Sequence, residues 1–418
     1  MRRSLVICII ASLLLFSSSL TALAAGAVIG GELTQSLGYD FDNEEISAAI
    51  TDYSIYLERG FGMDGKVYLS LKGKYNALDE THEIDLDEAF ASAYLKDIDI
   101  TVGKQAISWG TADGINPTSN INPIGFSLTD SQIKGKPVLA AQATYYGDNF
   151  DVTGVVVPAF VPLQLSDLGS LADNEMIDVI KGLTIPLPAN DLSSMEWAVK
   201  FGTYLSGYDL QASYFHGWED IPALVAKLSI DPTMQPMQPK AELEGKYRRV
   251  DVVGLAVAGV LGDFGVWAEG AYVVPEKLDL EPSSPLELSK MALSPNEPYI
   301  QAVIGADHTF DNGIYAQAQY IYWGNGSLTM PYKTDPTAET KPGHYLSNHL
   351  SYSFDMKNSL ELISLVNLRD KTAALVPTYT HSLTQATSLK IGVAAFVGTN
   401  GEFSGLPTQV TLQLRTVF

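Results

Sequence analysis

Cysteine is almost absent from this sequence, and so are long hydrophobic runs. The one cysteine, Cys8, lies within the first 24 residues and lacks the small residue before it that lipid attachment requires. Beyond those residues, no stretch approaches the roughly 18 uninterrupted apolar residues of a transmembrane helix. We therefore expect a chain without disulfides, without a lipid anchor and without a helical membrane span.

Positive charge is also scarce. The 418 residues include 48 Asp and Glu against 26 Lys and Arg, which gives a formal net charge of -22. Such an acidic chain repels polyanions, so we expect no nucleic acid among its partners. Charged residues make up only 18% of the sequence, whereas a soluble globular domain usually has about 25%. The composition therefore points away from an ordinary soluble domain.

The first 24 residues have the pattern of a secretory signal peptide. Two arginines at the start are followed by an apolar run over 5–16 and by Ala-Leu-Ala at 22–24. We expect residues 1–24 to direct export and to be removed.

Short segments of alternating apolar and polar residues fill the rest of the chain. In the segment 64–75, for example, Leu69 and Leu71 alternate with Ser70 and Lys72. This period of two is typical of a half-buried strand, and most segments are near the roughly 9–11 residues that a tilted strand needs to cross a bilayer. The predicted strands, about eighteen of them, are 27–39, 45–59, 64–75, 85–95, 97–107, 136–147, 149–158, 195–205, 207–217, 247–261, 263–274, 298–310, 313–323, 343–355, 358–368, 371–382, 386–398 and 407–418.

The connections between these segments are sorted by length. Tight connections rich in Asp, Asn and Gly mostly follow the even-numbered segments, as expected of hairpin turns. The long connections follow odd-numbered segments and cover 108–135, 159–194, 218–246, 275–297 and 324–342. Short turns on one rim and long loops on the other are characteristic of outer-membrane barrels.

The sequence therefore predicts an all-β fold. Residues 25–418 would form a transmembrane antiparallel up-and-down β-barrel of about eighteen strands, with sixteen as the alternative. The apolar faces would contact outer-membrane lipids and the polar faces a wet lumen. Both termini would lie on the short-turn rim, in the periplasm.

The end of the chain and the stretch 103–126 resemble known barrel proteins. The terminal Phe418, with the alternating residues before it, is similar to the assembly signal of Gram-negative-type outer-membrane barrels, which implies recognition by the barrel assembly machinery. Gly-Lys-Gln at 103–105, Trp-Gly at 109–110 and two Asn-Pro pairs resemble the alginate-export-like barrels and related uncharacterised barrels, which are porin-like. The chain departs from an alginate exporter in its acidity, because a polyanion calls for a basic lumen.

The stretch 108–135 is predicted to fold into the barrel and to narrow it. Glycine and proline let such a segment turn back on itself; the alternative is an outward loop whose Asn and Pro residues only make turns. Strict alternation places Lys104 toward lipid, unless a bulge at Gly103 turns it inward. The residues assigned to this constriction are Lys104, Gln105, Trp109, Asp113, Asn116, Asn120 and Asn122.

Charges of both signs are expected on the lumen face of the strands. Mixed charges bias permeation, and an acidic excess favours cations. Alternatively, the same residues pair across neighbouring strands and only stabilise the wall. By alternation, the lumen-lining charges are Lys72, Lys74, Glu88, Asp99, Glu196, Lys200, Glu269, Asp307, Glu361, Lys390 and Arg415.

Two of the long loops have an unexpected apolar content. Residues 170–182 have near-helical spacing after a candidate N-cap at Ser170, and the connection 218–246 contains several Ile, Leu, Val and Met residues. These side chains either form an apolar vestibule for a solute or pack the loops against each other and against lipid.

No catalytic or metal-binding pattern stands out. The six histidines are scattered, without a nucleophile motif or metal-ligand spacing. We expect no enzymatic activity, no cofactor and no metal. The predicted function is an outer-membrane channel for passive diffusion of small hydrophilic, cation-preferring solutes. The alternatives are a substrate-specific uptake channel for hydrophobic or aromatic compounds and a structural or adhesive barrel.

Overall fold

The computed structural model describes residues 26–125, 135–164, 179–231, 233, 238–329, 332–333 and 335–418. The predicted signal peptide, 1–24, lies outside these residues, and so does most of the predicted helix at 170–182. The part of that segment at 179–181 is described and is helical. No helix among the described residues is long and apolar enough to span a membrane.

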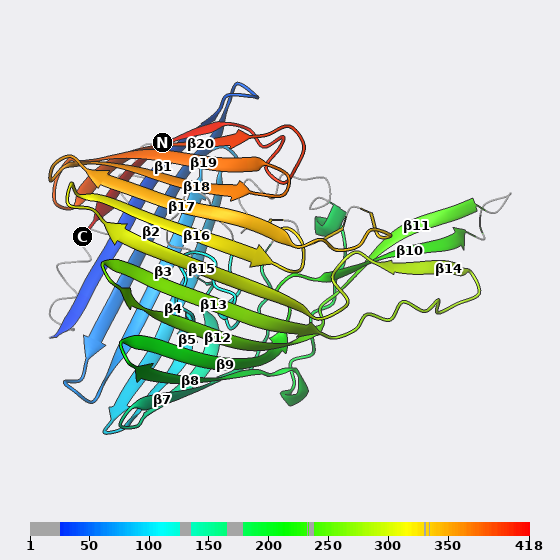
Figure 1. Cartoon of the computed structure of the whole chain (residues 1–418), viewed down its shortest axis with the longest axis horizontal. Coiled ribbons are helices and arrows are strands. Elements are labelled where there is room, and N and C mark those ends of the chain that lie inside the picture. The colour runs from blue at the N-terminus through cyan, green and yellow to red at the C-terminus, as the bar shows by residue number, and fades with distance from the viewer. Residues whose placement is uncertain are drawn as a thin grey trace.

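Eighteen antiparallel strands form a closed barrel (Figure 1). Each strand pairs with the next around the wall, and β21 pairs back with β1. Every segment predicted as a strand is a strand, and the count is eighteen rather than sixteen. The barrel strands are β1 (Ala27–Asp40), β2 (Glu45–Gly60), β3 (Gly65–Asn76), β4 (Thr81–Leu95), β5 (Ile98–Gln105), β6 (Val138–Tyr146), β7 (Phe150–Val157), β8 (Glu196–Leu205), β9 (Tyr208–Trp218), β12 (Arg249–Leu261), β13 (Phe264–Pro275), β15 (Tyr299–Thr309), β16 (Ile314–Trp323), β17 (Gly343–Ser353), β18 (Asn358–Asn367), β19 (Thr372–Ser382), β20 (Thr387–Val397) and β21 (Gln409–Val417).

Side chains alternate between the two faces of the wall, as the pleat of a strand requires. On β13, Glu269, Ala271 and Val273 are buried on the inner face, whereas Tyr272 between them is 47% exposed on the outer face. Leu255 of β12 is 64% exposed in the same way. An outward apolar surface of this kind is what a membrane barrel presents to lipid.

The connections fall on two rims. The short-turn rim has the connections of two to four residues that follow β2, β4, β6, β8, β12, β15, β17 and β19. Glycines at positive φ, such as Gly262 (64°) and Gly313 (82°), allow these tight turns. The long-loop rim has the connections 106–137, 158–195, 219–248, 276–298 and 324–342. The 3₁₀ helix η3 (Leu192–Ser194) ends the second of these connections.

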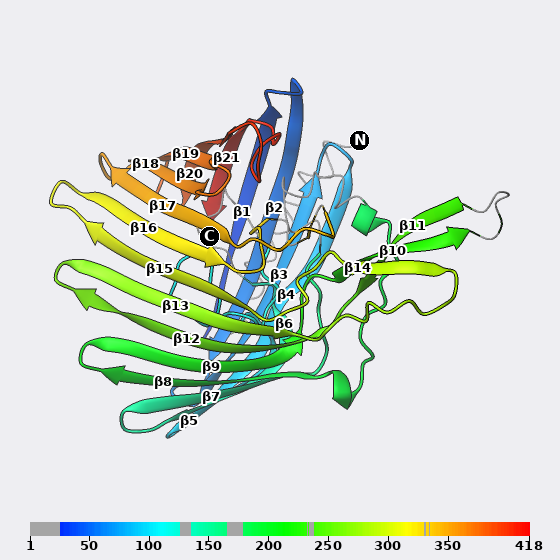
Figure 2. The ribbon, with the colours of Figure 1, turned by 45° about the vertical axis from the view of Figure 1, so that its right-hand side comes forward.

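A three-stranded antiparallel sheet projects beyond the long-loop rim (Figures 1 and 2). Its central strand is β10 (Ala223–Asp231), flanked by β11 (Gln238–Lys246) and β14 (Glu287–Ala292). The sequence analysis expected loops here, and that expectation is wrong. β11 reads Gln-Pro-Lys-Ala-Glu-Leu-Glu-Gly-Lys, so it has no continuous apolar face for an alternation argument to detect.

Candidate functional site in the barrel interior

Residues 106–125, here called the lumen loop, lie inside the barrel. The loop leaves β5, and its buried side chains Ile107, Trp109 and Ile121 pack against inner-face residues of β6, β7, β8, β9, β12 and β13. This is the stretch that the sequence predicts to fold inward, although 126–134 lies outside the described residues. Burial of these apolar side chains holds the loop against one side of the wall.

The first polar anchor of the lumen loop is Glu269 on β13, whose side chain is only 3% exposed. Its Oε1 accepts hydrogen bonds from the backbone N–H groups of Thr111 and Ala112, the latter at 2.7 Å, and its Oε2 accepts one from Thr118 Oγ1 at 3.0 Å. Gly110 has φ 93°, and a Cβ on it would meet the Glu269 carboxylate at 2.4 Å. A glycine is therefore required where the loop passes this carboxylate.

The second polar anchor lies farther around the wall, on β16. Gln317 Nε2 donates to Asp113 Oδ2 (2.7 Å), and Gln319 exchanges two hydrogen bonds with the Asp113 backbone (2.9 and 3.3 Å). From β5, the wall runs through β6, β7, β8, β9, β12, β13 and β15 before it reaches β16. Since that is close to half of the eighteen-stranded circumference, the lumen loop crosses the barrel.

Asn122, which is 1% exposed, joins the two ends of the lumen loop by hydrogen bonds. Asn122 Oδ1 accepts from Ile107 N (2.7 Å), and its Nδ2 donates to Gln105 O (3.3 Å) and Lys136 O (2.7 Å). The side chains of Gln105 and Asn120 also donate to backbone carbonyls, of Ala140 and of Pro117 respectively. These three predicted constriction residues therefore form the framework of the loop.

Trp109 and Asp113 differ in what they offer to a solute. Trp109 is 4% exposed, and Lys200 Nζ lies 5.7 Å from its ring centroid, so the indole belongs to the packed interior. Asp113 is exposed and is the one charged residue in the sequence 106–125. Among the predicted constriction residues, Asp113 thus presents charge to the lumen.

The assignment of Lys104 to the constriction is corrected by the register of β5. Pairing with β6 runs unbroken from Ile98 to Gln105, so no bulge at Gly103 turns the next side chain inward. Lys104 faces Leu139, which is 52% exposed on the outer face, and its ammonium contacts the carbonyl of Leu86. Strict alternation gave the right face for this residue.

The lumen charges predicted from alternation lie at inner-face positions, and most have described partners. Lys74 lies opposite Asp52 and Glu83, and Lys390 opposite Thr380 and Gln413, in the strand register. The other contacts are Lys72–Asp87 (2.9 Å), Arg415–Glu32 (2.7 Å), His349–Glu361 (2.8 Å), Tyr146 Oη to Asp99 (3.1 Å), Tyr315 Oη to Asp307 (3.1 Å), Trp218 N to Glu196 (2.9 Å) and Ala106 N to Glu88 (2.9 Å). These contacts favour a structural role for many individual positions.

A second segment, residues 398–408, also enters the barrel; we call it the second lumen loop. Phe403 is fully buried against inner-face residues that include Trp267, Ile321 and Tyr345. This loop was not predicted, because the residues at 398–405, Gly-Thr-Asn-Gly-Glu-Phe-Ser-Gly, are typical of an exposed turn. Four side chains and one backbone amide bind the Glu402 carboxylate: Ser327 Oγ (2.5 Å), Thr329 N (2.8 Å), Thr329 Oγ1 (2.8 Å), Tyr345 Oη (2.5 Å) and Asn367 Nδ2 (2.8 Å).

A cavity of about 280 Å³ lies where the lumen loop meets the long-loop rim. Its polar lining includes Asn116 of the lumen loop, Glu219, Asp220 and Arg248 of the rim, and Asn325 beyond β16. Its aromatic lining consists of Phe215, Trp218, Tyr299, Trp323 and Tyr332. The connection 218–246 stands out in the sequence for its apolar content, but these polar residues were not predicted to belong to a site.

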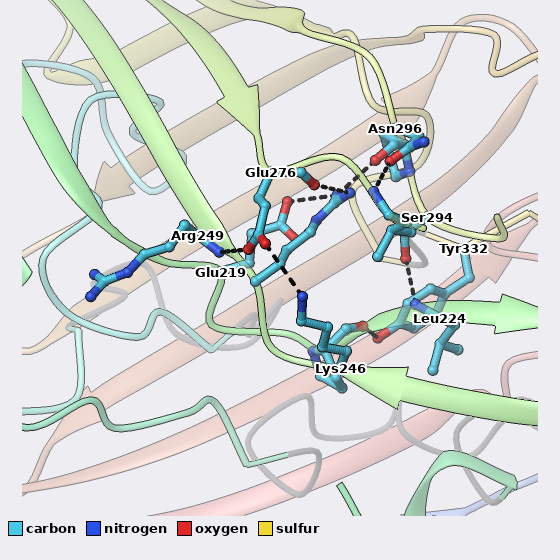
Figure 3. A network of polar contacts seen from close by, with 12 residues as sticks. Glu219, Leu224, Lys246, Arg249, Glu276, Ser294, Asn296 and Tyr332 are labelled. Atoms are coloured by element: carbon cyan, nitrogen blue, oxygen red, sulfur yellow. Dashed lines mark hydrogen bonds and ion pairs between the residues drawn. The ribbon is translucent and has the colours of Figure 1, made fainter. Parts of the chain in front are cut away.

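Polar contacts hold the rim around this cavity together (Figure 3). Glu276 accepts from Lys246 Nζ (3.3 Å) and from Arg249 N (3.1 Å), and Leu224 N donates to Ser294 Oγ (2.9 Å). Tyr332 Oη donates to the carbonyl of Pro222 (2.8 Å). The base of the projecting sheet is therefore joined to the barrel rim by hydrogen bonds and an ion pair.

Burial shapes the acidity of the two carboxyl groups at this rim. Burial raises the pKa of Glu219, while the hydrogen bond and charge of Arg248 lower it in part. Burial raises the pKa of Asp220 well above its usual value, and the charges of Glu196 and Glu219 raise it further. Within the described residues, no three His, Cys, Asp or Glu side chains are arranged to hold a metal ion.

A closed eighteen-stranded antiparallel barrel with an infolded loop has the porin-type fold. No protein-family model and no curated protein matches this chain. Among solved structures, OccD3 of Pseudomonas aeruginosa aligns over 94% of this chain and 91% of its own, with a TM-score of 0.52 and 7% identity. OmpF of Salmonella typhi, solved in complex with daunomycin, aligns over 94% and 97% with a TM-score of 0.46 and 10% identity. The likeness to OccD3 supports the fold and says nothing of the solute.

Proposed function

We propose that this protein is an outer-membrane channel for passive diffusion of small hydrophilic solutes, with the lumen loop as its constriction. The observation that carries the proposal is the path of the loop across the barrel, from β5 to the anchors at Glu269 and Gln317. A loop that spans the lumen reduces the open cross-section and fixes which side chains a passing solute meets.

The exposed outer face supports the location. Large apolar side chains that are 40% exposed or more occur on outward positions of many strands, for example Leu71, Phe201, Ile304 and Leu412. Apolar residues on that face suit contact with lipid. We extend the proposal to the partners: outer-membrane lipids around the wall, and the barrel assembly machinery at the C-terminal strand that ends in Phe418.

Cation preference is part of the proposal, and the lumen loop is its main support. Asp113 is the one charged residue of 106–125, and its side chain is exposed. A carboxylate in a constriction attracts cations and repels anions. The formal net charge of -22 acts in the same direction at long range.

Single-channel recording of the refolded mature chain tests the proposal. In planar bilayers under a potassium chloride gradient, we expect a stable conductance and a reversal potential of the sign that cation preference requires. A reversal potential of the opposite sign would remove the cation preference. A barrel that never conducts would contradict the channel and favour the structural or adhesive alternative.

A second candidate is a substrate-specific uptake channel for hydrophobic or aromatic compounds. The observation that favours it is the row of aromatic side chains, including Trp218, Tyr299 and Trp323, around the rim cavity. Ligand cavities are usually lined by apolar and aromatic groups with a few placed polar groups. Saturable uptake of a neutral aromatic compound into proteoliposomes would support this candidate, and uptake that stays linear with concentration would count against it.

A further inference from the structure

The rim cavity contains hydrogen-bond acceptors that are not used. Among the described residues, Asn116 Oδ1 and Asn325 Oδ1 are buried and accept no hydrogen bond, and both residues line the cavity. Buried polar atoms are nearly always hydrogen-bonded, since an unsatisfied one costs about 1–3 kcal/mol. Two such oxygens beside one cavity indicate that a ligand in the cavity donates hydrogen bonds to them.

The positive charge that lines the cavity, that of Arg248, is already paired with Glu219. Arg248 is 1% exposed, and its Nε and Nη2 donate to the two oxygens of Glu219 at 2.5 and 2.9 Å. Its Nη2 also donates to Pro295 O (2.6 Å), and its Nη1 to Glu276 O (3.4 Å). A guanidinium with these four hydrogen bonds has little left to offer to an anionic ligand.

The carboxyl group of Asp220 has no basic partner. Its side chain has no hydrogen bond or ion pair within the described part of the chain, and the charges of Glu196 and Glu219 add to the effect of burial in raising its pKa, which favours the protonated form in the empty cavity. Glu219 is paired with Arg248, so Asp220 is the carboxyl group of the cavity lining that is left to pair with a bound cation. A cation placed there would favour the ionised form of Asp220 and offset its repulsion with Glu196 and Glu219.

The remaining wall is aromatic. Trp218, Tyr299 and Trp323 line the cavity together with Phe215 and Tyr332. Aromatic faces attract cations and also bury apolar surface. The volume of about 280 Å³ is several times the roughly 30 Å³ that one water occupies in the liquid, so a small organic molecule has room.

We propose that this cavity binds a small organic ammonium ion, with Asp220, Asn116 and Asn325 accepting its N–H groups and the aromatic side chains contacting its apolar body. The inference deepens the proposed function and rests on it, because the ligand would be a solute captured at the entrance to the lumen loop. Asn116 links the two, since it belongs to the loop and lines the cavity. The raised pKa of Asp220 in the empty cavity agrees with this, because a bound ammonium ion would favour the ionised carboxylate and lower that pKa.

A matched ligand series tests the proposal on the refolded full chain in detergent. Isothermal titration calorimetry would compare phenethylammonium, 2-phenylethanol and 3-phenylpropionate, which share an aromatic body and differ in the charge of the head group. We expect the ammonium to bind about tenfold or more tightly than the alcohol, as one charge-assisted interaction allows, and the carboxylate to bind most weakly. Equal affinities, or tighter binding of the alcohol or carboxylate, would overturn the inference.

Two charge-matched variants localise the site. Asp220→Asn should weaken phenethylammonium binding about tenfold or more and leave 2-phenylethanol binding nearly unchanged. Asp279→Asn removes the same charge from an exposed rim residue outside the cavity lining and should change neither. An equal loss in both variants, or none in Asp220→Asn, would show that the cavity is not the ammonium site.

Calorimetry in detergent does not require conduction, so the two proposals can fail separately. If the barrel stays closed in bilayers but binds phenethylammonium through Asp220, the binding site is supported and the proposed channel function is contradicted. If the barrel conducts but binds the three ligands equally, the channel function is supported and the ammonium site is contradicted.

Discussion

At the scale of single residues, Glu269 has the largest consequence for the lumen loop. Its carboxylate accepts three hydrogen bonds from the loop while it is almost fully buried. Hydrogen bonds to a charged group contribute about 1.5–3 kcal/mol each, and donors left unsatisfied in a buried place add a further cost. One side chain on β13 therefore fixes the position of the loop tip.

Glu269→Ala should release the tip of the lumen loop. Because the variant removes all three hydrogen bonds, we expect a larger single-channel conductance with frequent brief transitions between levels. Thr118→Val removes one of the three bonds and should have a clearly smaller effect. Recording in planar bilayers checks both, and a conductance unchanged in Glu269→Ala would mean that the loop does not limit the current.

Asp113→Asn should change selectivity more than conductance. The substitution keeps the size of the side chain and the backbone hydrogen bonds to Gln319, but it removes the charge from the loop. We expect the reversal potential in a salt gradient to move toward zero. Asp279→Asn, on the exposed rim, is the control for a general loss of negative charge. A reversal potential that moves equally in both variants would place the selectivity outside the constriction.

At the scale of elements, the barrel strands could be predicted from sequence because each has one outward apolar side. Every second side chain on such a strand is apolar and points outward, as Leu69 and Leu71 illustrate on β3, so the pattern is local and visible. The face of Lys104 followed from the same rule. Alternation also placed Glu269 on the inner wall, but it could not reveal that the loop would use its carboxylate.

Elements whose position depends on distant contacts were not predictable in this way. β11 lies outside the barrel wall and pairs through its backbone with β10, so its polar sequence carries no periodic signal. The second lumen loop depends on Glu402 and Phe403 meeting side chains of β17 and β18, far away in the sequence. Such contacts exist only after the barrel has closed.

The projecting sheet should resist acid through Glu287 on β14. The hydrogen bond from Lys227 on β10, at 2.6 Å, is the main cause that lowers the pKa of Glu287 to about 2, and Lys290 adds to it. A lowered pKa stabilises the sheet above the usual carboxyl range, near pH 4.3, and this contribution is lost as the pH falls toward about 2. Amide hydrogen exchange in β14 should therefore stay slow down to that range.

Lys227→Met is the matched variant for this pH dependence. It keeps the length of the side chain and removes the ammonium that also contacts Glu244 at 3.2 Å. We expect faster exchange of β14 amides at neutral pH and a transition that moves to higher pH. Exchange that is identical in the variant at every pH would contradict a role for this ion pair.

Glu402→Ala should free the second lumen loop from the wall. The carboxylate holds donors from β17, β18 and the connection 324–342, so its loss should let 398–408 move away and raise the conductance. Glu297→Ala, at a side chain that is 74% exposed, is the control. If the conductance of Glu402→Ala equals that of the parent, then the lumen loop alone determines the open area.

At the scale of the whole molecule, the wall and the lumen are stabilised differently. Backbone pairing continues around all eighteen strands, whereas the two lumen loops depend on a few buried carboxylates and aromatic side chains. We expect the folded barrel to migrate faster than the boiled chain on a denaturing gel. Glu269→Ala and Glu402→Ala should keep this shift, and an unshifted parent band would contradict a stable closed barrel.

The pairing of β1 with β21 closes the barrel, and it determines when in synthesis the barrel can close. Gly31 and Phe418 exchange two backbone hydrogen bonds, of 2.9 and 3.0 Å, and the ion pair of Arg415 with Glu32 joins residues 383 positions apart. Contacts of such long range are slow to form. β1 therefore keeps one edge unpaired until β21 has been synthesised and has reached it. During that interval the open edge of β1 can pair with other chains, so the unfinished barrel is prone to aggregation.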